Sequence, residues 1–400
     1  PPTRSLSPEK ATSNLWERQM AKLGDICFQI TDGSHNPPAG IENSKHLMLS
    51  SKNINDDEIT TTAPRFLTDE QFDIENKRTN VLSGDLLMTI VGTVGRVAVV
   101  PEMLAGICLQ RSVAVIKPNP TIINNRYLMY QLQSMRKFLE SEARGVAQKG
   151  IYLKQVGDLS VITPPLDEQY RVVDTLDHIS GLIHIYQQQL TKLDELIKAR
   201  FVEMFGTYPD NPFGWNTGKI QDVVSNVRYG SSRPAVEGGK YPYLRMNNIT
   251  YAGELDLTDT KRIDVPDSEL DKCTVQRGDV LFNRTNSKEL VGKTCVYNRD
   301  DMMVLAGFVI RVRVNERILP EFLVAFLNTA FSKQMLLGMC KTAIGQANIN
   351  AKEMQNIGLY IPPIALQEQF VDLKKQTDKS KLFAELFAQN ACILAENRSK

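Results

Sequence analysis

The sequence lacks the features that would assign it to several simple classes of protein. Its six cysteines and four histidines occur without CxxC, zinc-finger or other metal-ligand spacing, so we expect no disulfide framework and no metal site. Its 47 basic and 46 acidic residues leave a net charge of +1, which argues against a strongly basic, indiscriminate nucleic-acid binder but allows local basic patches. The longest apolar stretch, residues 86–100, contains Gly92 and Gly95 and therefore predicts two strands around a turn, not a membrane span.

The start of the sequence also lacks a targeting signal. It opens with Pro1-Pro2, without a methionine and without a basic-then-apolar leader, so we expect a trimmed start, a cytoplasmic location and no membrane partner. The chain is long and apolar enough to form a sizeable hydrophobic core. Its 400 residues are 42% hydrophobic and 23% charged, as in ordinary globular proteins. Domains usually contain ~100–200 residues, so this length favours two domains.

The two halves of the chain repeat each other. Four motifs return in the same order and at nearly the same separation, which predicts a duplicated domain. These pairs are TPPLDEQ (163–169) with IPPIALQEQ (361–369), VLSGDLLM (81–88) with VQRGDVLF (275–282), Gly95-Arg96 with Gly292-Lys293, and Trp16 with Trp215.

Each half has the same coarse pattern of secondary structure. Short alternating apolar runs at 96–100, 113–116 and 309–313 predict strands, and the stretches 125–141 and 320–338 predict helices at matching places. The fold class is therefore α+β, with two similar mixed α/β domains.

Two long segments follow a heptad pattern instead. Apolar residues recur there at alternating spacings of four and three, which predicts two helices that pack as an antiparallel coiled coil. The seam residues are Val172, Leu176, Ile179, Ile183, Tyr186, Leu190, Leu193 and Ile197 in the first segment, and Phe370, Leu373, Phe387 and Leu394 in the second, with the smaller Thr377, Ser380, Ala384 and Ala391 between them. Each helix follows its own domain, so antiparallel pairing would relate the domains by a pseudo-twofold axis, and a helix of ~38 residues would span ~57 Å.

These patterns divide the chain into five parts. They are an N-terminal tail (1–15), a first domain (16–165), a central helix (166–206), a second domain (207–363) and a C-terminal helix (364–400).

The order and spacing of the motifs resemble the specificity subunit of type I restriction-modification systems over essentially the whole chain. The matching features are the openings Lys22-Leu23-Gly24-Asp25 and Lys219-Ile220-Gln221-Asp222, the Gly-Asp strand starts at 84 and 278, and the Pro-Pro…Glu-Gln helix starts at 164 and 362. The resemblance implies that each domain is a target-recognition domain for one half of a bipartite double-stranded DNA site. It implies that the two helices set the spacer between the halves and dock two methyltransferase (modification) subunits.

The same resemblance implies further partners and no catalytic residue in this chain. Restriction/translocase subunits would join the complex, and S-adenosylmethionine, ATP and Mg²⁺ would belong to the partner subunits. The physics agrees with this division, because two readers held at a fixed distance bind a split site with a high effective concentration for the second contact.

Basic, amide and hydroxyl residues in loops and at strand ends are the candidates for reading DNA. Arg and Lys suit guanine and phosphate, whereas Asn and Gln suit adenine in the major groove. The candidates are Ser34, His35, Lys52, Asn53, Arg96, Arg111, Gln148 and Lys149 in the first domain, and Tyr229, Ser232, Arg233, Arg245, Asn247, Arg284, Asn286, Lys288, Lys293, Gln346 and Asn348 in the second. Residues 283–288 are the richest single stretch in hydrogen-bond donors, and 345–348 and 147–150 come next. For each candidate, a plain solvated surface position is the competing interpretation.

Three other motifs have simple structural interpretations. The run Asn36-Pro37-Pro38-Ala39 lacks the aromatic residue of an adenine methyltransferase motif, so we interpret it as a loop. The run 92–95 (GTVG) is predicted as a strand-to-strand turn, with a backbone clamp for nucleic acid beside Arg96 as the competing interpretation. The acidic residues 56–58 are predicted as a solvated face.

Two other classes of function compete with DNA reading. A stand-alone DNA methyltransferase or nuclease would need a cofactor loop or clustered metal-binding carboxylates, and we find neither in the sequence. A coiled-coil protein adaptor would use the heptads but leave both α/β domains without a task.

Overall fold

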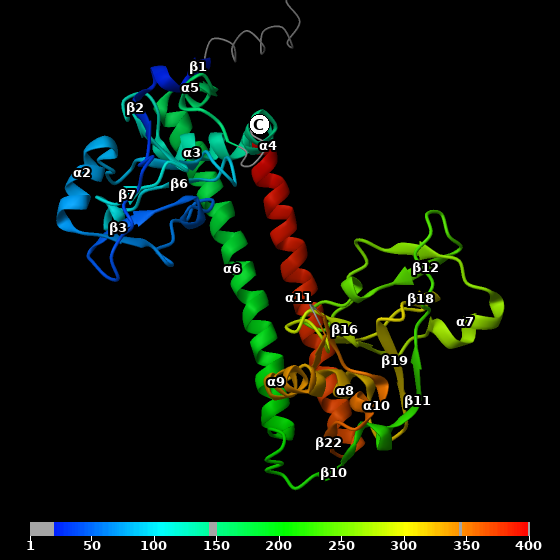
Figure 1. The fold of residues 1–400 in the computed structure, drawn as a ribbon. Coiled ribbons are helices and arrows are strands. Elements are labelled where there is room, and N and C mark those ends of the chain that lie inside the picture. Colours follow the sequence, from blue (N-terminus) through cyan, green and yellow to red (C-terminus); the bar gives the residue numbers. More distant parts are fainter. Residues whose placement is uncertain (1–19, 144–149, 344–345, 399–400) are drawn as a thin grey trace, which may run out of the picture. The chain divides into compact units, whose positions relative to one another are not determined.

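The computed structural model describes residues 20–143, 150–343 and 346–398, with the side chains at 341–343, 346 and 392–398 left out of the description. Two compact units divide the chain, one formed by residues 1–186 and 386–400 and the other by 187–385. Each unit contains one α/β domain and a segment of each of two long helices, α6 (Leu166–Phe205) and α11 (Ile364–Arg398) (Figure 1). We call the α/β parts domain 1 and domain 2.

In its described residues, domain 1 contains three small sheets and four short α-helices. The order β2-β8-β5-β6 forms an antiparallel sheet, β4-β3-β7 forms a mixed sheet, and β1 pairs with β9. Its elements are β1 (Met20–Lys22), β2 (Cys27–Asp32), β3 (His46–Leu49), β4 (Arg65–Leu67), α2 (Asp69–Thr79), β5 (Leu86–Thr89), β6 (Val97–Val99), β7 (Cys108–Leu109), β8 (Val113–Pro118), α3 (Asn125–Ser134), α4 (Arg136–Glu142), α5 (Leu153–Gly157) and β9 (Ser160–Ile162).

Domain 2 repeats this topology and adds β14 and a further sheet in the order β16-β21-β20. The order β11-β19-β15-β17 matches the first sheet, β13-β12-β18-β14 matches the second with one added strand, and β10 pairs with β22. Its elements are β10 (Asn216–Lys219), β11 (Val224–Tyr229), β12 (Tyr241–Leu244), β13 (Lys261–Ile263), α7 (Asp267–Cys273), β14 (Thr274–Val275), β15 (Val280–Asn283), β16 (Thr285–Asn286), β17 (Thr294–Val296), β18 (Met303–Leu305), β19 (Val309–Val314), α8 (Pro320–Leu327), α9 (Ala330–Met339), β20 (Lys341–Ala343), β21 (Gln346–Asn348), α10 (Ala351–Gln355) and β22 (Gly358–Ile361). The prediction of two similar mixed α/β domains is confirmed.

The repeated Gly-Asp motif starts the central strand of each larger sheet. Gly84 and Gly278 have φ values of 87° and 89°, a left-handed conformation that favours glycine. The carboxylate of Asp85 accepts a 2.8 Å hydrogen bond from the amide of Leu82, and Asp279 does the same for Gln276. The motif therefore recurs because it closes the same turn twice.

The repeated Glu-Gln motif ties each long helix to its domain. Gln169 and Gln367 have no exposed surface, and each side chain bonds only backbone groups. The carboxamide oxygen of Gln169 accepts from the amide of Asn124 (2.7 Å), and that of Gln367 accepts from Leu319 (2.8 Å). Each amide nitrogen donates to a proline carbonyl at the helix start, at 2.7 and 2.8 Å.

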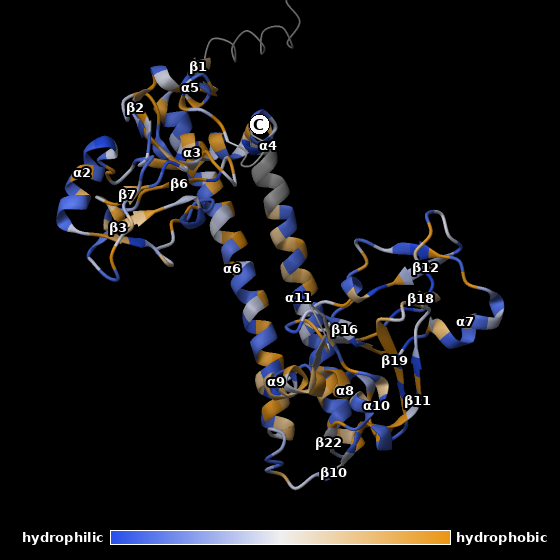
Figure 2. Cartoon of the chain, in the orientation of Figure 1, coloured by the Kyte–Doolittle hydropathy of each residue, from blue (hydrophilic) through white to orange (hydrophobic). Residues whose placement is uncertain are grey.

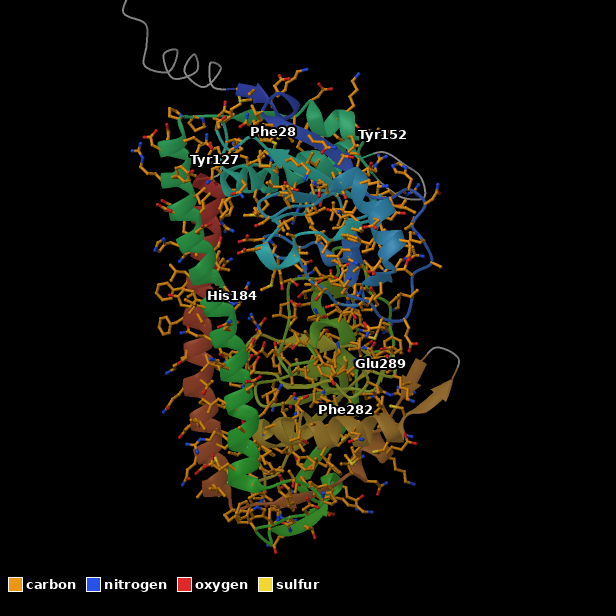
Figure 3. The ribbon with its side chains drawn as sticks, turned by 90° about the vertical axis from the view of Figure 1, so that its left-hand side faces the viewer. Phe28, Tyr127, Tyr152, His184, Phe282 and Glu289 are labelled. Carbon is orange, nitrogen blue, oxygen red and sulfur yellow. The ribbon has the colours of Figure 1, made fainter. Side chains whose placement is uncertain are left out.

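Apolar side chains from the sheets and helices form a core in each domain. The larger cores lie between the first sheet and the helix pair α3/α4 in domain 1, or α8/α9 in domain 2. Phe282 of β15 lies in the domain 2 core, whereas Phe28 of β2 and Tyr152 lie on the surface of domain 1, exposed by 70% and 72% (Figure 3). Figure 2 shows the corresponding hydrophobic colouring on α8, α9 and β19 and hydrophilic colouring on α2.

The two long helices contact each other within each unit. In the second unit the rings of Phe201 and Phe205 lie 5.3 and 5.7 Å from that of Phe370, and Lys381 pairs with Asp194, so the helices run antiparallel there. In the first unit the ring of Tyr186 stacks on that of Phe387 at 5.6 Å. The predicted packing of the helices is confirmed at these positions.

Burial follows the predicted seam along α6 and along part of α11. Every predicted seam residue of α6 is buried or half-buried, as are Phe370 and Leu373 of α11. Thr377, Ala384 and Ala391 are buried, whereas Ser380 is exposed and Phe387 keeps 54% of its surface. The side chain of Leu394 lies outside the described residues.

Each of the two helices predicted after the larger sheets is in fact a pair of helices. At Ser134 the side-chain hydroxyl donates to the carbonyl of Gln131 at 2.7 Å, and this local bond accompanies the break between α3 and α4. In domain 2 the hydroxyl of Thr329 accepts from the amide of Ser332 and caps a new helix, α9. Within the described residues no single helix has the length and hydropathy to span a membrane, and α8 with α9 meets these criteria only as a pair bent by 70°.

Candidate nucleic-acid interface

The chain of domain 1 makes a close crossing where its two main sheets meet. The amide of Gly33 donates to the carbonyl of Val113 (3.1 Å), and the amide of Ser34 donates to that of Leu109 (2.7 Å). The carbonyl of Ser34 accepts from the amide of Arg111 (2.9 Å). A Cβ atom at Gly33 would overlap the carbonyl oxygen of Leu109, so only glycine fits.

Domain 2 makes the same crossing with the same hydrogen bonds. Gly230 donates to Val309 (3.3 Å), Ser231 donates to Leu305 (2.6 Å), and the carbonyl of Ser231 accepts from Gly307 (2.7 Å). A Cβ atom at Gly230 would likewise overlap the Leu305 carbonyl oxygen. We call the surface around each crossing the reading edge of its domain.

The two reading edges share a backbone but differ in side chains. Equivalent positions follow from the shared hydrogen bonds and from the matching turns at 50–53 and 245–248. The pairs, with domain 1 first, are Asp32 and Tyr229, His35 and Ser232, Lys52 and Asn247, Ile90 and Arg284, Gln110 and Ala306, Arg111 and Gly307, and Ser112 and Phe308. The scaffold is therefore duplicated and its surface chemistry is not.

Two adjoining hollows mark the reading edge of domain 1. One of about 270 Å³ is lined by the predicted residues Ser34, His35, Lys52 and Arg111, and none of its described lining residues is acidic. A second hollow of about 480 Å³ shares Lys52 with it and adds Asn53 and Arg65, again without an acidic lining residue among those described. Cationic and amide groups that line an open hollow suit phosphates and base edges.

Two further domain 1 candidates, Asn53 and Arg96, are less available. Asn53 is buried, and its side chain accepts from the amide of Ser50 (3.0 Å) and donates to the carbonyl of Thr62 (3.0 Å), so it shapes the turn and leaves little of its amide for a base. Arg96 is half-buried and donates to the side-chain oxygen of Asn55 at 3.2 Å. Gln148 and Lys149 lie outside the described residues.

In domain 2 the fold brings the two best predicted stretches together. Strand β16 pairs with β21, which places Asn286 and Asn348 on neighbouring strands. Arg284 precedes β16, and its guanidinium lies 4.8 Å from the ring centroid of Tyr229. The side-chain oxygen of Asn348 is buried without a hydrogen-bond partner, and the side chain of Gln346 lies outside the described residues.

Three basic candidates of domain 2 are paired or buried within the protein. Arg233 pairs with Glu269 at 2.7 Å and Arg245 pairs with Asp259 at 2.8 Å, so each charge already has a partner. Lys293 is only 7% exposed, and burial lowers the pKa of its ammonium. Ser232, Asn247 and Lys288 are exposed.

The sequence alone missed several residues at these edges. Phe308 follows the crossing in domain 2 and is 53% exposed, and Gln110 and Arg65 line the hollows of domain 1. Phe308 is the counterpart of Ser112, so comparison of the two copies around the Val113 and Val309 strand starts could have drawn attention to it.

The structure also tests the other sequence interpretations. Residues 92–95 form the predicted turn between β5 and β6, with positive φ at both glycines. The acidic residues 56–58 are exposed as predicted, and Asp56 and Asp57 in addition pair with Arg136 and Arg126. Within the described residues no group of three or more His, Cys, Asp or Glu side chains could hold a metal ion.

A protein-family model matches both halves of the chain. The model for the type I restriction modification DNA specificity domain matches residues 40–195 and again residues 212–386. The chain therefore belongs to this family of DNA specificity domains.

Individual relatives match parts of the chain at low identity. It is 22% identical over 274 residues to the type I restriction enzyme EcoKI specificity subunit of Escherichia coli K12, covering 64% of this chain and 59% of that protein. It is 27% identical over 206 residues to the EcoBI specificity subunit of Escherichia coli, covering 50% of this chain and 42% of that protein. The matched region thus spans only about half the length of these relatives.

Solved structures share the fold over nearly the whole chain. The S subunit of a type I restriction-modification system from M. genitalium has a TM-score of 0.53 at 12% identity and covers 95% of this chain and 94% of its own. A chain from a structure of a type I R-M system, concerned with complex assembly and conformational transition, has a TM-score of 0.58 at 17% identity and covers 95% and 96%. At these identities the likeness supports the fold alone.

Proposed function

We propose that this chain is the sequence-specific DNA-binding specificity subunit of a type I restriction-modification enzyme. Each reading edge binds one half of a bipartite double-stranded target. The observation that carries this proposal is the duplicated crossing at Gly33 and Gly230, where one backbone presents two different sets of side chains. A duplicated scaffold with diverged surface groups is what two readers of unlike half-sites require.

The DNA contacts divide between the two edges by chemistry. In domain 1, Lys52 and Arg111 are exposed at the hollows and supply phosphate and guanine contacts, with Ser34 and His35 beside them. In domain 2, Arg284, Asn286 and Asn348 supply the donors and acceptors. We give less weight to Asn53, Arg233, Arg245 and Lys293, because each is buried or already paired.

The long helices set the spacer and dock partners in this proposal. A helix of 40 residues rises ~60 Å, enough to hold two readers more than one turn of DNA apart. Its exposed Leu182 and Ile185, and the exposed Leu382 and Phe383 of α11, offer apolar surface for two methyltransferase subunits. The pseudo-twofold relation between the domains stays a prediction.

The chain itself performs no chemistry in this proposal. S-adenosylmethionine, ATP and Mg²⁺ are bound and used by the methyltransferase and restriction/translocase subunits. The isolated chain, incubated with DNA, Mg²⁺ and methyl donor, is expected to give neither methylated nor cleaved product, and turnover by this chain would favour the enzyme alternative.

The test is methylation mapping followed by binding. The chain is expressed with its methyltransferase subunits, genomic methylation gives the motif, and binding is then compared for cognate and scrambled duplexes at physiological salt. We expect a split motif and a preference for the cognate duplex of at least ~10³-fold. Equal binding of the two duplexes would refute the proposed function.

A further inference from the structure

Three arginines hold the loop that follows the reading edge of domain 1. The loop runs from Asn55 to Glu58 and is separated from Lys52 and Asn53 of the edge by the single residue Ile54. Arg96 donates to Asn55 (3.2 Å), and Arg136 of α4 pairs with Asp56. The third arginine, Arg126 of α3, pairs with Asp57. The loop is thus fixed by side chains from separate elements.

Arg126 also connects this loop to the long helix α6. Its guanidinium donates to both carboxylate oxygens of Asp57 at 3.1 Å, and to both oxygens of Asp177 on α6 at 2.7–3.0 Å. Tyr130 adds a 2.6 Å hydrogen bond to Asp177. One planar cation therefore joins the loop behind the reading edge to the helix.

The equivalent loop of domain 2 reaches the long helices with other residues. The two loops are equivalent because they are closed by the same kind of backbone hydrogen bond. The amide of Asn55 donates to the carbonyl of Glu58 (2.9 Å), and the amide of Thr250 donates to the carbonyl of Glu254 (2.9 Å). Lys381 of α11 lies 4.0 Å from the carboxylate of Glu254 and pairs with Asp194 of α6. Both loops thus connect a loop carboxylate through a cation to a carboxylate of α6. The cation is Arg126 of α3 in domain 1 and Lys381 of α11 in domain 2.

We propose that these loops are clasps that fix the angle of each reading edge on its segment of the long helices, with Arg126 and Lys381 as positioning residues. This inference rests on the proposed function. Each domain places a cation between a loop carboxylate and a carboxylate of α6, bidentate at Arg126 and at a longer 4.0 Å for Lys381 and Glu254, which supports a common positioning role. A rigid clasp makes the complex selective for one spacer length. If a reading edge could change its angle on the helices, it could also bind half-sites one base pair nearer or farther away.

The test measures spacer selectivity in the assembled complex. Duplexes carry the mapped motif with its natural spacer or with one base pair added or removed, and the complex is made with wild-type chain, Arg126→Met, Arg126→Lys or Asp57→Asn. We expect Arg126→Met and Asp57→Asn to reduce the preference for the natural spacer by roughly three- to tenfold, the range for a partly exposed charged network. Arg126→Lys keeps a cation and should recover part of the preference.

A matched control and base-substituted duplexes separate positioning from other effects. Arg171→Gln removes an exposed arginine on α6 that pairs along the helix with Asp167, and it should leave spacer preference unchanged. Both clasp variants should still reject duplexes with a substituted half-site base. Unchanged spacer preference in Arg126→Met and Asp57→Asn would overturn the inference, as would an equal loss of binding to every duplex in both. If the wild-type complex rejects no scrambled duplex, the proposed function itself fails.

Discussion

The guanidinium of Arg284 lies over the ring of Tyr229, 4.8 Å from its centroid, while the Tyr229 hydroxyl accepts a 2.9 Å hydrogen bond from the amide of Ala351. The hydrogen bond fixes the orientation of the Tyr229 ring, and the cation–π contact with this ring restrains the position of the Arg284 guanidinium. A positioned guanidinium can bind the two acceptors of guanine.

We expect Arg284→Gln to weaken recognition at one base pair of the domain 2 half-site. Loss of a bidentate contact should cost about 1–3 kcal/mol of discrimination at that position and leave the domain 1 half-site unaffected. Competition binding with duplexes substituted one base pair at a time measures this. Arg299→Gln, which removes an exposed arginine paired with Asp301, is the control. Uniform loss at all positions would contradict the assignment.

Lys52→Gln should act on affinity more than on specificity. A phosphate contact at this exposed lysine releases about one counterion, so the slope of log K against log salt should become shallower by about 0.9. The measurement is a salt titration of duplex binding by the complex. Lys45→Gln removes a lysine outside the hollows, and a similar change of slope in this control would argue against the reading edge.

Gly33→Ala should damage domain 1 because a Cβ atom would overlap the Leu109 carbonyl oxygen. We expect a loss of about 2 kcal/mol or more in the free energy of unfolding, followed by denaturant titration. Gly181→Ala on α6, where a Cβ atom meets no neighbour within 4 Å, should instead stabilise the helix by about 0.5–1 kcal/mol. Equal effects of the two substitutions would contradict the close crossing.

Gln169→Leu tests the link between domain 1 and α6. Leucine keeps the volume but leaves the amide of Asn124 and the carbonyls of Ile122 and Pro164 without their partner. Unsatisfied buried groups should lower the free energy of unfolding by about 2–4 kcal/mol. Glu168→Gln, at the exposed neighbouring position, should change it little, and thermal melts of both variants provide the comparison.

Lys333 makes stability depend on alkaline pH. Burial, with the nearby charge of Lys293, lowers the pKa of Lys333 from 10.5 to about 8, and its nitrogen has no hydrogen-bond partner. Between these values the unfolded chain binds a proton that the folded chain does not, so the free energy of unfolding rises with pH from about 8 to 10.5. Below this window both states are protonated, and the full cost of the buried charge remains.

Lys333→Met should remove that rise and stabilise the protein at pH 7 by roughly 2 kcal/mol. Urea titrations at pH 7.5 and 9.5 measure it, with Lys379→Met, an exposed position on α11, as control. Parallel pH dependence in wild type and Lys333→Met would contradict the lowered pKa.

Sequence alone could predict the features that repeat along the chain. The duplicated Gly-Asp and Glu-Gln motifs predicted two alike domains because they recur in the same order along the chain, and the heptads predicted the helix packing seen at Tyr186 and Phe387. These signals are local in sequence, so no knowledge of tertiary contacts was needed.

Availability of the candidate DNA contacts could not be predicted in this way. Arg233 and Arg245 meet Glu269 and Asp259 through loops that close only in the folded domain, and the burial of Lys293 depends on its tertiary neighbours. The engagement of Asn53 could have been predicted, because its side chain accepts a hydrogen bond from the amide of Ser50 only three residues away, as is common for asparagine in turns.

Selection from a randomised duplex library tests the central claim most directly. The assembled complex selects duplexes with wild-type chain and with a chain whose domain 2 edge is altered at Arg284 and Phe308. Two reading edges predict two short enriched blocks at a fixed separation, of which only one changes in the altered chain while the other block and the separation persist. Enrichment of one continuous block, or a change in both blocks together, would contradict the account.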